Sequence, residues 1–135
     1  SSAMNDVSLG ISLAKELGRL DVGQTVVVKN GAAVAAEAME GTDGCLERAG
    51  ALAGAGCVVV KMAKPNQDMR FDVPVIGKNT IEKLAKIQAA LLVIEAGKTL
   101  LVDPDVIALA DRLGIPILAL SAVEIESMPV NSSFP

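Results

Sequence analysis

The densest run of polar side chains in this chain lies in residues 64–74, which read Lys-Pro-Asn-Gln-Asp-Met-Arg-Phe-Asp-Val-Pro. If residues 68–73 are extended, Asp68, Arg70 and Asp72 share one face, because side chains alternate along a strand. Two carboxylates around a guanidinium can hold Mg²⁺ through oxygen atoms and a pyrophosphate through cationic groups. The pattern alone is equally consistent with a surface ladder of salt bridges in which Arg70 neutralises both aspartates.

Two lysines extend this polar run toward the preceding segment. Lys61 interrupts a continuous apolar run at residues 57–63, which predicts a central strand covered on both faces. Lys64 follows that run directly and opens the polar segment. Cations and carboxylates are therefore expected together at the end of a buried strand.

Residues 40–43, Glu-Gly-Thr-Asp, form a second polar segment at a predicted junction between a strand and a helix. A helix N-terminus has free backbone N–H groups and partial positive charge, which suit an anion such as phosphate. Asp43 in the first turn could bind a metal ion or interact only with the helix dipole. For Thr42 the favoured interpretation is an N-cap, a position where threonine is common.

Two further turns hold polar side chains. Residues 77–80 lead into another helix, where Thr80 is predicted to be the N-cap and a phosphate-binding nest is the alternative. Glu95 ends an apolar strand, and ligands of α/β sheets gather outside the carboxyl ends of strands. The Gly-Lys-Thr triplet at 97–99 is not a phosphate-binding P-loop, because the glycine-rich run and the following helix are missing.

The hydrophobic spacing predicts an α/β fold with a mixed sheet, in which an N-terminal helix and a β-hairpin precede β/α units. Asn30-Gly31 lies between two β-prone runs and predicts the hairpin, since both turn residues must adopt positive φ. Alternation of helices and strands after it favours a parallel second half. The expected helices cover residues 7–20, 42–53, 80–89 and 104–114, and the expected strands cover residues 25–29, 33–38, 57–63, 91–96, 99–102 and 116–120.

One folded domain, residues 7–121, is expected in this chain of 135 residues. Residues 1–6 are expected to be an expression tag or a disordered start, and residues 122–135 a tail. We expect no signal peptide. The longest apolar stretch, residues 49–60, is too short to span a bilayer and is broken by glycines.

The composition excludes several classes of function. Nucleic-acid binding usually needs aromatic side chains for stacking and a basic surface, but aromatic residues make up 1% of the chain and its net charge is −4. We therefore expect no nucleic-acid partner. Because histidine is absent, a zinc site would lack its usual ligands, and Ser–His and Cys–His catalysis are excluded. Cys45 and Cys57 form no C-x-x-C pair, and two buried thiols would indicate a reducing, cytoplasmic environment.

Four segments carry a resemblance to a known family. They are residues 17–24 (LGRLDVGQ), 37–43 (EAMEGTD), 64–74 (KPNQDMRFDVP) and 94–99 (IEAGKT). Together they resemble the C-terminal domain of the histidine-free, two-domain UDP-2,3-diacylglucosamine pyrophosphatases of lipid A biosynthesis. The similarity covers most of the chain with order and spacing kept, and the block at 64–74 is its most specific part.

The resemblance implies hydrolysis of UDP-2,3-diacylglucosamine to UMP and 2,3-diacylglucosamine 1-phosphate, with Mg²⁺ (or Mn²⁺) as the cofactor. It implies action in the cytoplasm at the membrane face, with peripheral contact between the protein and the inner membrane. It also implies an N-terminal domain that is absent from this chain and a substrate held between the two domains, so that the chain alone is expected to be inactive. A core rich in Ala and Val would suit a homodimer.

If the chain is the catalytic half of such an enzyme, each polar residue singled out above can be assigned a role. Metal binding or water activation is assigned to Asp68 and Asp72, with Asp43 reaching the same site from a neighbouring loop. The proposed substrate contacts are the phosphate clamps Lys61, Lys64 and Arg70, the hydrogen-bonding groups Gln67, Thr42 and Thr80, and the more distant Glu95. The alternative is a non-catalytic domain that binds a phosphorylated ligand or mediates oligomerisation.

Overall fold

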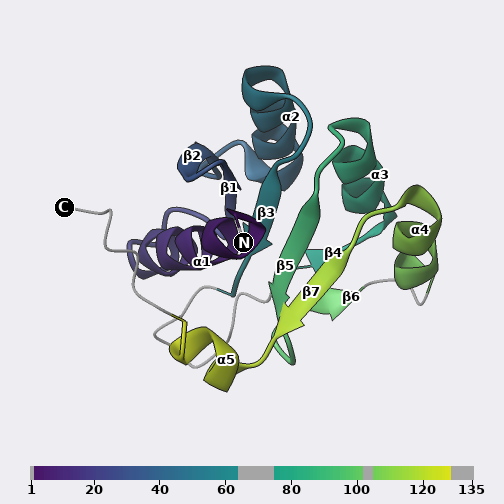
Figure 1. Cartoon of the computed structure of the whole chain (residues 1–135). Coiled ribbons are helices and arrows are strands. Elements are labelled where there is room, and N and C mark those ends of the chain that lie inside the picture. Colours follow the sequence, from purple (N-terminus) through teal and green to yellow (C-terminus); the bar gives the residue numbers. More distant parts are fainter. Residues whose placement is uncertain (1, 64–74, 102–104, 129–135) are drawn as a thin grey trace.

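The computed structural model describes residues 2–63, 75–101 and 105–128. Within these ranges a five-stranded mixed sheet with the order β2-β1-β3-β5-β7 lies between two layers of helices, and β4 pairs with β6 separately (Figure 1). The predicted α/β fold with a mixed sheet is therefore confirmed. The elements are α1 (Ser2–Arg19), β1 (Thr25–Lys29), β2 (Ala32–Ala36), α2 (Gly41–Ala53), β3 (Val58–Lys61), β4 (Val75–Ile76), α3 (Lys78–Lys86), β5 (Leu91–Glu95), β6 (Leu100–Leu101), α4 (Val106–Leu113), β7 (Ile117–Leu120) and α5 (Ala122–Glu126).

The sheet has an antiparallel half and a parallel half. β1 pairs antiparallel with both β2 and β3, whereas β3, β5 and β7 run parallel to one another. Thr25, the first residue of β1, lies opposite Lys61, the last residue of β3. The start of β1 and the carboxyl ends of β3, β5 and β7 therefore share one edge of the sheet, which we call the carboxyl edge.

Hydrophobic side chains cover both faces of the sheet. Val59 belongs to the cluster that includes buried residues of α2, α3 and α4, whereas Val60, its neighbour in β3, belongs to the cluster formed with α1 and α5. Successive residues of a strand point to opposite faces, so a strand covered on both sides needs a continuous apolar run. On the α1 side the packing is close, because a Cβ atom at Gly10 would lie 2.5 Å from Cγ2 of Val60.

The hairpin between β1 and β2 is confirmed and is bound to α1. Asn30 and Gly31 adopt φ of 52° and 80°, the positive values that a two-residue hairpin turn requires. The buried Asp6 of α1 accepts hydrogen bonds from both turn residues, with Asn30 N 3.0 Å from Oδ2 and Gly31 N 2.8 Å from Oδ1. One carboxylate therefore fixes the turn against the first helix.

Both ends of the described chain contain more helix than predicted. Residues 2–6, expected to be a tag or a disordered start, are helical and belong to α1. Residues 122–126, expected to be part of a tail, form α5. Ser121 and Glu124 cap α5 reciprocally, and Ile125 is buried in the core. The Ser-x-x-Glu spacing before an apolar residue is a recognised helix start that could have predicted α5.

The predicted N-caps of α2 and α3 are wrong. Glu40 occupies the N-cap position of α2 and makes no side-chain capping bond, so Thr42 lies inside the first turn. The extended Gly77 precedes α3, which begins at Lys78, so Thr80 also lies inside its helix. No helix in the described parts of the chain is long and apolar enough to cross a membrane.

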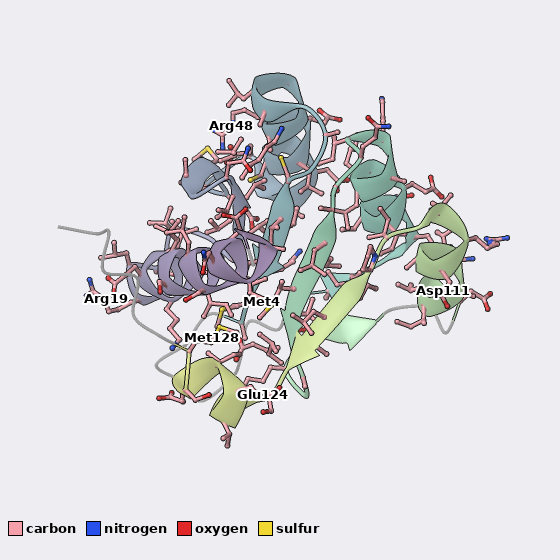
Figure 2. The ribbon with its side chains drawn as sticks, viewed as in Figure 1. Met4, Arg19, Arg48, Asp111, Glu124 and Met128 are labelled. Atoms are coloured by element: carbon pink, nitrogen blue, oxygen red, sulfur yellow. The ribbon has the colours of Figure 1, made fainter. Side chains whose placement is uncertain are left out.

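The Asp6 contact predicts a local dependence of stability on one side chain. Asp6→Ala should lower the free energy of unfolding by about 2 kcal/mol, because the hairpin turn loses its charged acceptor. Asp6→Asn keeps one acceptor oxygen and should lower it by less. Asp111→Ala, on the exposed surface of α4 (Figure 2), is the control and should change stability by less than about 0.5 kcal/mol. Urea denaturation of the three variants measures this, and equal loss in Asp6→Ala and Asp111→Ala would contradict the role of Asp6.

A second prediction concerns the two cysteines, whose thiols should be protected from chemical modification in the folded chain. Cys45 and Cys57 are free and buried; burial raises the pKa of Cys45 to about 11 and also raises the pKa of Cys57. A raised pKa keeps the thiol protonated, so the stability contributed by Cys45 is fully present below its ordinary pKa of 9.0 and is lost as the pH rises through about 11. At pH 8, Ellman's reagent should modify both thiols only as fast as the chain unfolds. Rapid labelling of the folded chain would contradict this.

Candidate functional site at the carboxyl edge

Two charged side chains are buried at neighbouring strand ends of the carboxyl edge. Lys61 ends β3 and Glu95 ends β5, and their exposed fractions are 6% and 8%. Lys61 lies opposite Ile94 in the parallel register, so Glu95 extends one residue farther along the edge. Burying a charge costs free energy unless the charge is paired or hydrogen-bonded. The partners of these two groups therefore indicate the chemistry of this edge.

The Lys61 ammonium is bound at the N-terminus of α2. Its Nζ donates a hydrogen bond of 2.7 Å to the hydroxyl of Thr42, which lies 3.4 Å from the hydroxyl of the fully buried Thr25. The first N–H groups of an α-helix have no partner within the helix, and the helix N-terminus carries partial positive charge. A buried ammonium and a helix N-terminus therefore meet at one point of the carboxyl edge, and both favour an anion.

The Glu95 carboxylate binds the chain that leaves β3. Its Oε1 accepts a hydrogen bond of 2.9 Å from the backbone N–H of Ala63, and its Oε2 lies 3.8 Å from Nζ of Lys98. The prediction that Glu95 lies at the carboxyl end of a strand is confirmed. Its contact with a substrate stays a prediction.

Asp43 follows Thr42 in α2 but has different neighbours. It is exposed and lines a shallow pocket of about 260 Å³ together with the α3 residues Asn79, Glu82, Lys83 and Lys86. The nearby Lys83 forms an ion pair with Glu47 of α2. The hydrogen bond to Glu47 and, by a smaller amount, the charge of Asp43 raise the pKa of Lys83. Asp43 therefore faces cationic and amide groups of α3, while Thr80 is half-buried in the first turn of that helix.

The strongest polar block of the sequence lies outside the described residues. Five of the residues predicted to bind metal or substrate belong to this block, namely Lys64, Gln67, Asp68, Arg70 and Asp72. The proximity of Asp43 to Asp68 therefore stays a prediction. Among the residues that the structure describes, no group of three acidic, histidine or cysteine side chains could hold a metal ion. Within the described residues, the carboxyl edge therefore combines a buried ammonium with a helix N-terminus and contains no such metal-ligand group.

Two side chains at this edge were missed by sequence reasoning. Thr25 is an ordinary residue for the start of a strand, and only its register opposite Lys61 reveals its place in the site. Arg48, on the side of α2 near β2 (Figure 2), donates through Nη2 to the carbonyl oxygen of Ala36 at 2.8 Å and pairs with Glu40 at 2.7 Å. Arg48 therefore links the end of β2 to the start of α2, the helix whose first turn contains Thr42. A single arginine in a helical segment does not indicate such a role from the sequence.

Comparison with known proteins identifies the family of this chain. The family model for the LpxI C-terminal domain matches residues 1–118 of this chain. This chain belongs to the LpxI C-terminal domain family. The UDP-2,3-diacylglucosamine pyrophosphatase LpxI of Caulobacter vibrioides is 42% identical over 131 residues, a match that covers 90% of this chain and 46% of that protein. The LpxI-type domain described here therefore spans about half the length of that relative, and the family resemblance predicted from the four segments is confirmed.

The hydrogen bond between Lys61 and Thr42 is expected to stabilise the fold. Thr42→Val keeps the shape of the side chain and removes the hydroxyl, so the buried ammonium loses an acceptor and the free energy of unfolding should fall by about 1.5–3 kcal/mol. Thr42→Ser keeps the hydroxyl, so the free energy of unfolding should fall by less. Denaturation in urea compares the two variants with Asp43→Ala, the neighbouring exposed change, which should cost about 0.3–1 kcal/mol through the helix dipole. If Thr42→Val were no more destabilising than Thr42→Ser, the hydrogen bond would make no net contribution to stability.

Proposed function

We propose that this LpxI C-terminal domain is the catalytic half of a Mg²⁺-dependent pyrophosphatase that hydrolyses UDP-2,3-diacylglucosamine to UMP and 2,3-diacylglucosamine 1-phosphate. The family membership and the name of the Caulobacter relative support the substrate and the reaction. The other half of the enzyme corresponds to the part of that relative which this chain does not match. We place the reaction at the cytoplasmic face of the inner membrane, because the substrate is a lipid.

The observation that carries this proposal is the buried Lys61 ammonium against Thr42 at the N-terminus of α2. A pyrophosphate is a compact, highly charged anion, and a buried cation next to helical N–H groups suits such a ligand. This point lies at the end of β3, and the polar block at residues 64–74 follows in the chain. The family's most specific segment therefore begins close to the buried Lys61 ammonium, which supports a phosphate site there.

In the proposed reaction the side chains divide into cations, hydrogen-bonding groups and carboxylates. Lys61, Lys64 and Arg70 bind the phosphate oxygens, while Thr42, Thr80 and Gln67 orient them through hydrogen bonds. Asp68 and Asp72, assisted by Asp43, bind the metal or orient the attacking water. When bound, Mg²⁺ would polarise a phosphoryl oxygen and offset the charge of the transition state. The oxygen of a water molecule forms a bond to one phosphorus atom, and the bond from that atom to the bridging oxygen breaks. The other phosphate leaves with the bridging oxygen, and the proton lost by the water passes to the solvent.

The proposal is tested by fusing this chain to the unmatched part of Caulobacter LpxI. With UDP-2,3-diacylglucosamine and Mg²⁺, the fusion should release equal amounts of UMP and 2,3-diacylglucosamine 1-phosphate, measured by mass spectrometry. Chelation of the metal should stop the release, and the chain alone should be inactive because half of the substrate site is absent. Caulobacter LpxI is the positive control. A folded fusion that binds the substrate without cleaving it would instead support a non-catalytic domain for phosphorylated ligands.

A substitution in this fusion tests the carboxylates. Asp68→Ala should lower turnover by about a hundredfold or more, because metal positioning or water activation is worth at least this factor. Its melting temperature should stay near that of the parent fusion. Asp111→Ala on the surface of α4 should leave both quantities unchanged. If Asp68 serves only to pair with Arg70, the variant will melt early but hydrolyse substrate at nearly the parent rate per folded molecule.

A further inference from the structure

The polypeptide on both sides of residues 64–74 is bound to one connection, residues 95–101. On the N-terminal side, Ala63 donates its backbone N–H to the Glu95 carboxylate at 2.9 Å. On the C-terminal side, β4 pairs in parallel with β6, with Val75 opposite Leu100 and Ile76 opposite Leu101 (Figure 1). The connection between β5 and β6 therefore contacts the described residues that flank the polar block at each end.

This connection is itself closed by hydrogen bonds around Glu95. The backbone carbonyl of Glu95 accepts the N–H of Lys98 at 3.3 Å and the hydroxyl of Thr99 at 3.0 Å. The next residue, Ala96, donates its N–H to the carbonyl of Leu120 at 2.8 Å, which ties the end of β5 to β7. The main chain that carries the Glu95 side chain is thus held by the turn that follows it and by the neighbouring strand.

We propose that Glu95 is a positioning residue, which fixes the chain at Ala63, the last described residue before the polar block at 64–74, by binding its N–H. This inference rests on the proposed function, because it assigns to that block the catalytic groups Lys64, Asp68 and Asp72. A carboxylate that accepts a backbone N–H acts as a rigid link between two strand ends, β5 and β3. Displacement of a catalytic group by about 1 Å can lower the rate by about a hundredfold.

The geometry distinguishes this role from the substrate contact predicted from the sequence. The Glu95 residue is only 8% exposed, one carboxylate oxygen binds Ala63, and the other lies 3.8 Å from Lys98. Two negatively charged species, a carboxylate and a pyrophosphate, also repel each other unless a cation lies between them. The hydrogen bond to the backbone of Ala63 is therefore the contact through which we expect Glu95 to act.

The hydrogen bond is tested on this chain alone, without any activity assay. In amide exchange measured by NMR, Glu95→Ala should speed exchange of the Ala63 N–H by about tenfold or more, because the group loses its acceptor. Glu95→Gln keeps an acceptor oxygen and should leave this exchange near the parent value. The internal control is the neighbouring Met62 N–H, which binds the carbonyl of Gln24 at 2.9 Å and should not change. Lys98→Met tests the ion pair and should also leave Ala63 protected.

The consequence for catalysis is tested in the fusion with the unmatched part of Caulobacter LpxI. Glu95→Ala should lower kcat by about ten- to a hundredfold with KM changed by less than about threefold, and Glu95→Gln should recover most of kcat. A residue that acts through its charge on the substrate or the metal would give equal losses for Ala and Gln and a raised KM. A purely structural residue would lower the melting temperature and leave kcat per folded molecule unchanged.

The two experiments separate the outcomes. Unchanged exchange of Ala63 in Glu95→Ala, or equal kinetic losses in Glu95→Ala and Glu95→Gln, would overturn the positioning role. If the parent fusion is inactive while Caulobacter LpxI is active, the proposed function fails whatever the exchange of Ala63 shows. If the Glu95→Ala chain does not fold, Glu95→Gln decides: normal exchange at Ala63 with a kcat near the parent value would support the positioning role, and normal exchange with a strongly lowered kcat would overturn it.

Discussion

The parallel pairing of β3 with β5 is the constraint on which the candidate site depends. It brings Lys61 and Glu95 to adjacent positions at the carboxyl edge, where both charges are buried. Each charge needs a partner because an isolated buried charge would be strongly destabilising. Lys61 binds Thr42 on α2, and Glu95 binds the main chain at Ala63. Strand pairing therefore also determines where α2 begins against the sheet and in which direction the chain leaves β3.

Close packing of small residues makes this arrangement compact. With aromatic residues at 1% of the composition, the core relies on Val, Ile, Leu and Ala, and contacts must be made by backbones that approach closely. Gly10 lets α1 lie against Val60, and Asp6 of the same helix binds the hairpin turn. β1 is thereby held at both ends, by the turn on one side and by its pairing of Thr25 with Lys61 on the other. The antiparallel half of the sheet thus gives the carboxyl edge a rigid flank.

The distribution of charge supports a site for anions in a chain that is acidic overall. The net charge is −4, yet the carboxyl edge buries an ammonium beside a helix N-terminus. A low-dielectric setting strengthens the attraction between such groups and a phosphate. Acidic side chains are also part of this edge, but Glu95 binds a backbone N–H and Asp43 faces α3.

Local patterns in the sequence were sufficient to predict several elements correctly. Asn30-Gly31 needs positive φ at both positions, and the apolar run around Val59 needs cover on both faces, so the hairpin and the central strand followed from neighbouring residues alone. The family also followed from local motifs, because the block at 64–74 is specific as a string of residues. The helix starts at Thr42 and Thr80 were predicted wrongly, since many local sequences fit a capping pattern and the hydroxyl of Thr42 binds Lys61 instead.

The tertiary structure alone decided which polar residues meet. Thr25 begins β1 and Lys61 ends β3, with β2 and α2 between these two strands, and only the register of β1 with β3 places the two residues together. Asp43 and Thr42 are neighbours in sequence, but the helix turns them toward different partners, α3 and Lys61. Glu95 was recognised from the sequence as the end of a strand, but its acceptor role depends on the path of another strand's backbone. Sequence determines local conformation through short-range sterics and periodicity, whereas a site is assembled by pairings whose partners lie far apart along the chain.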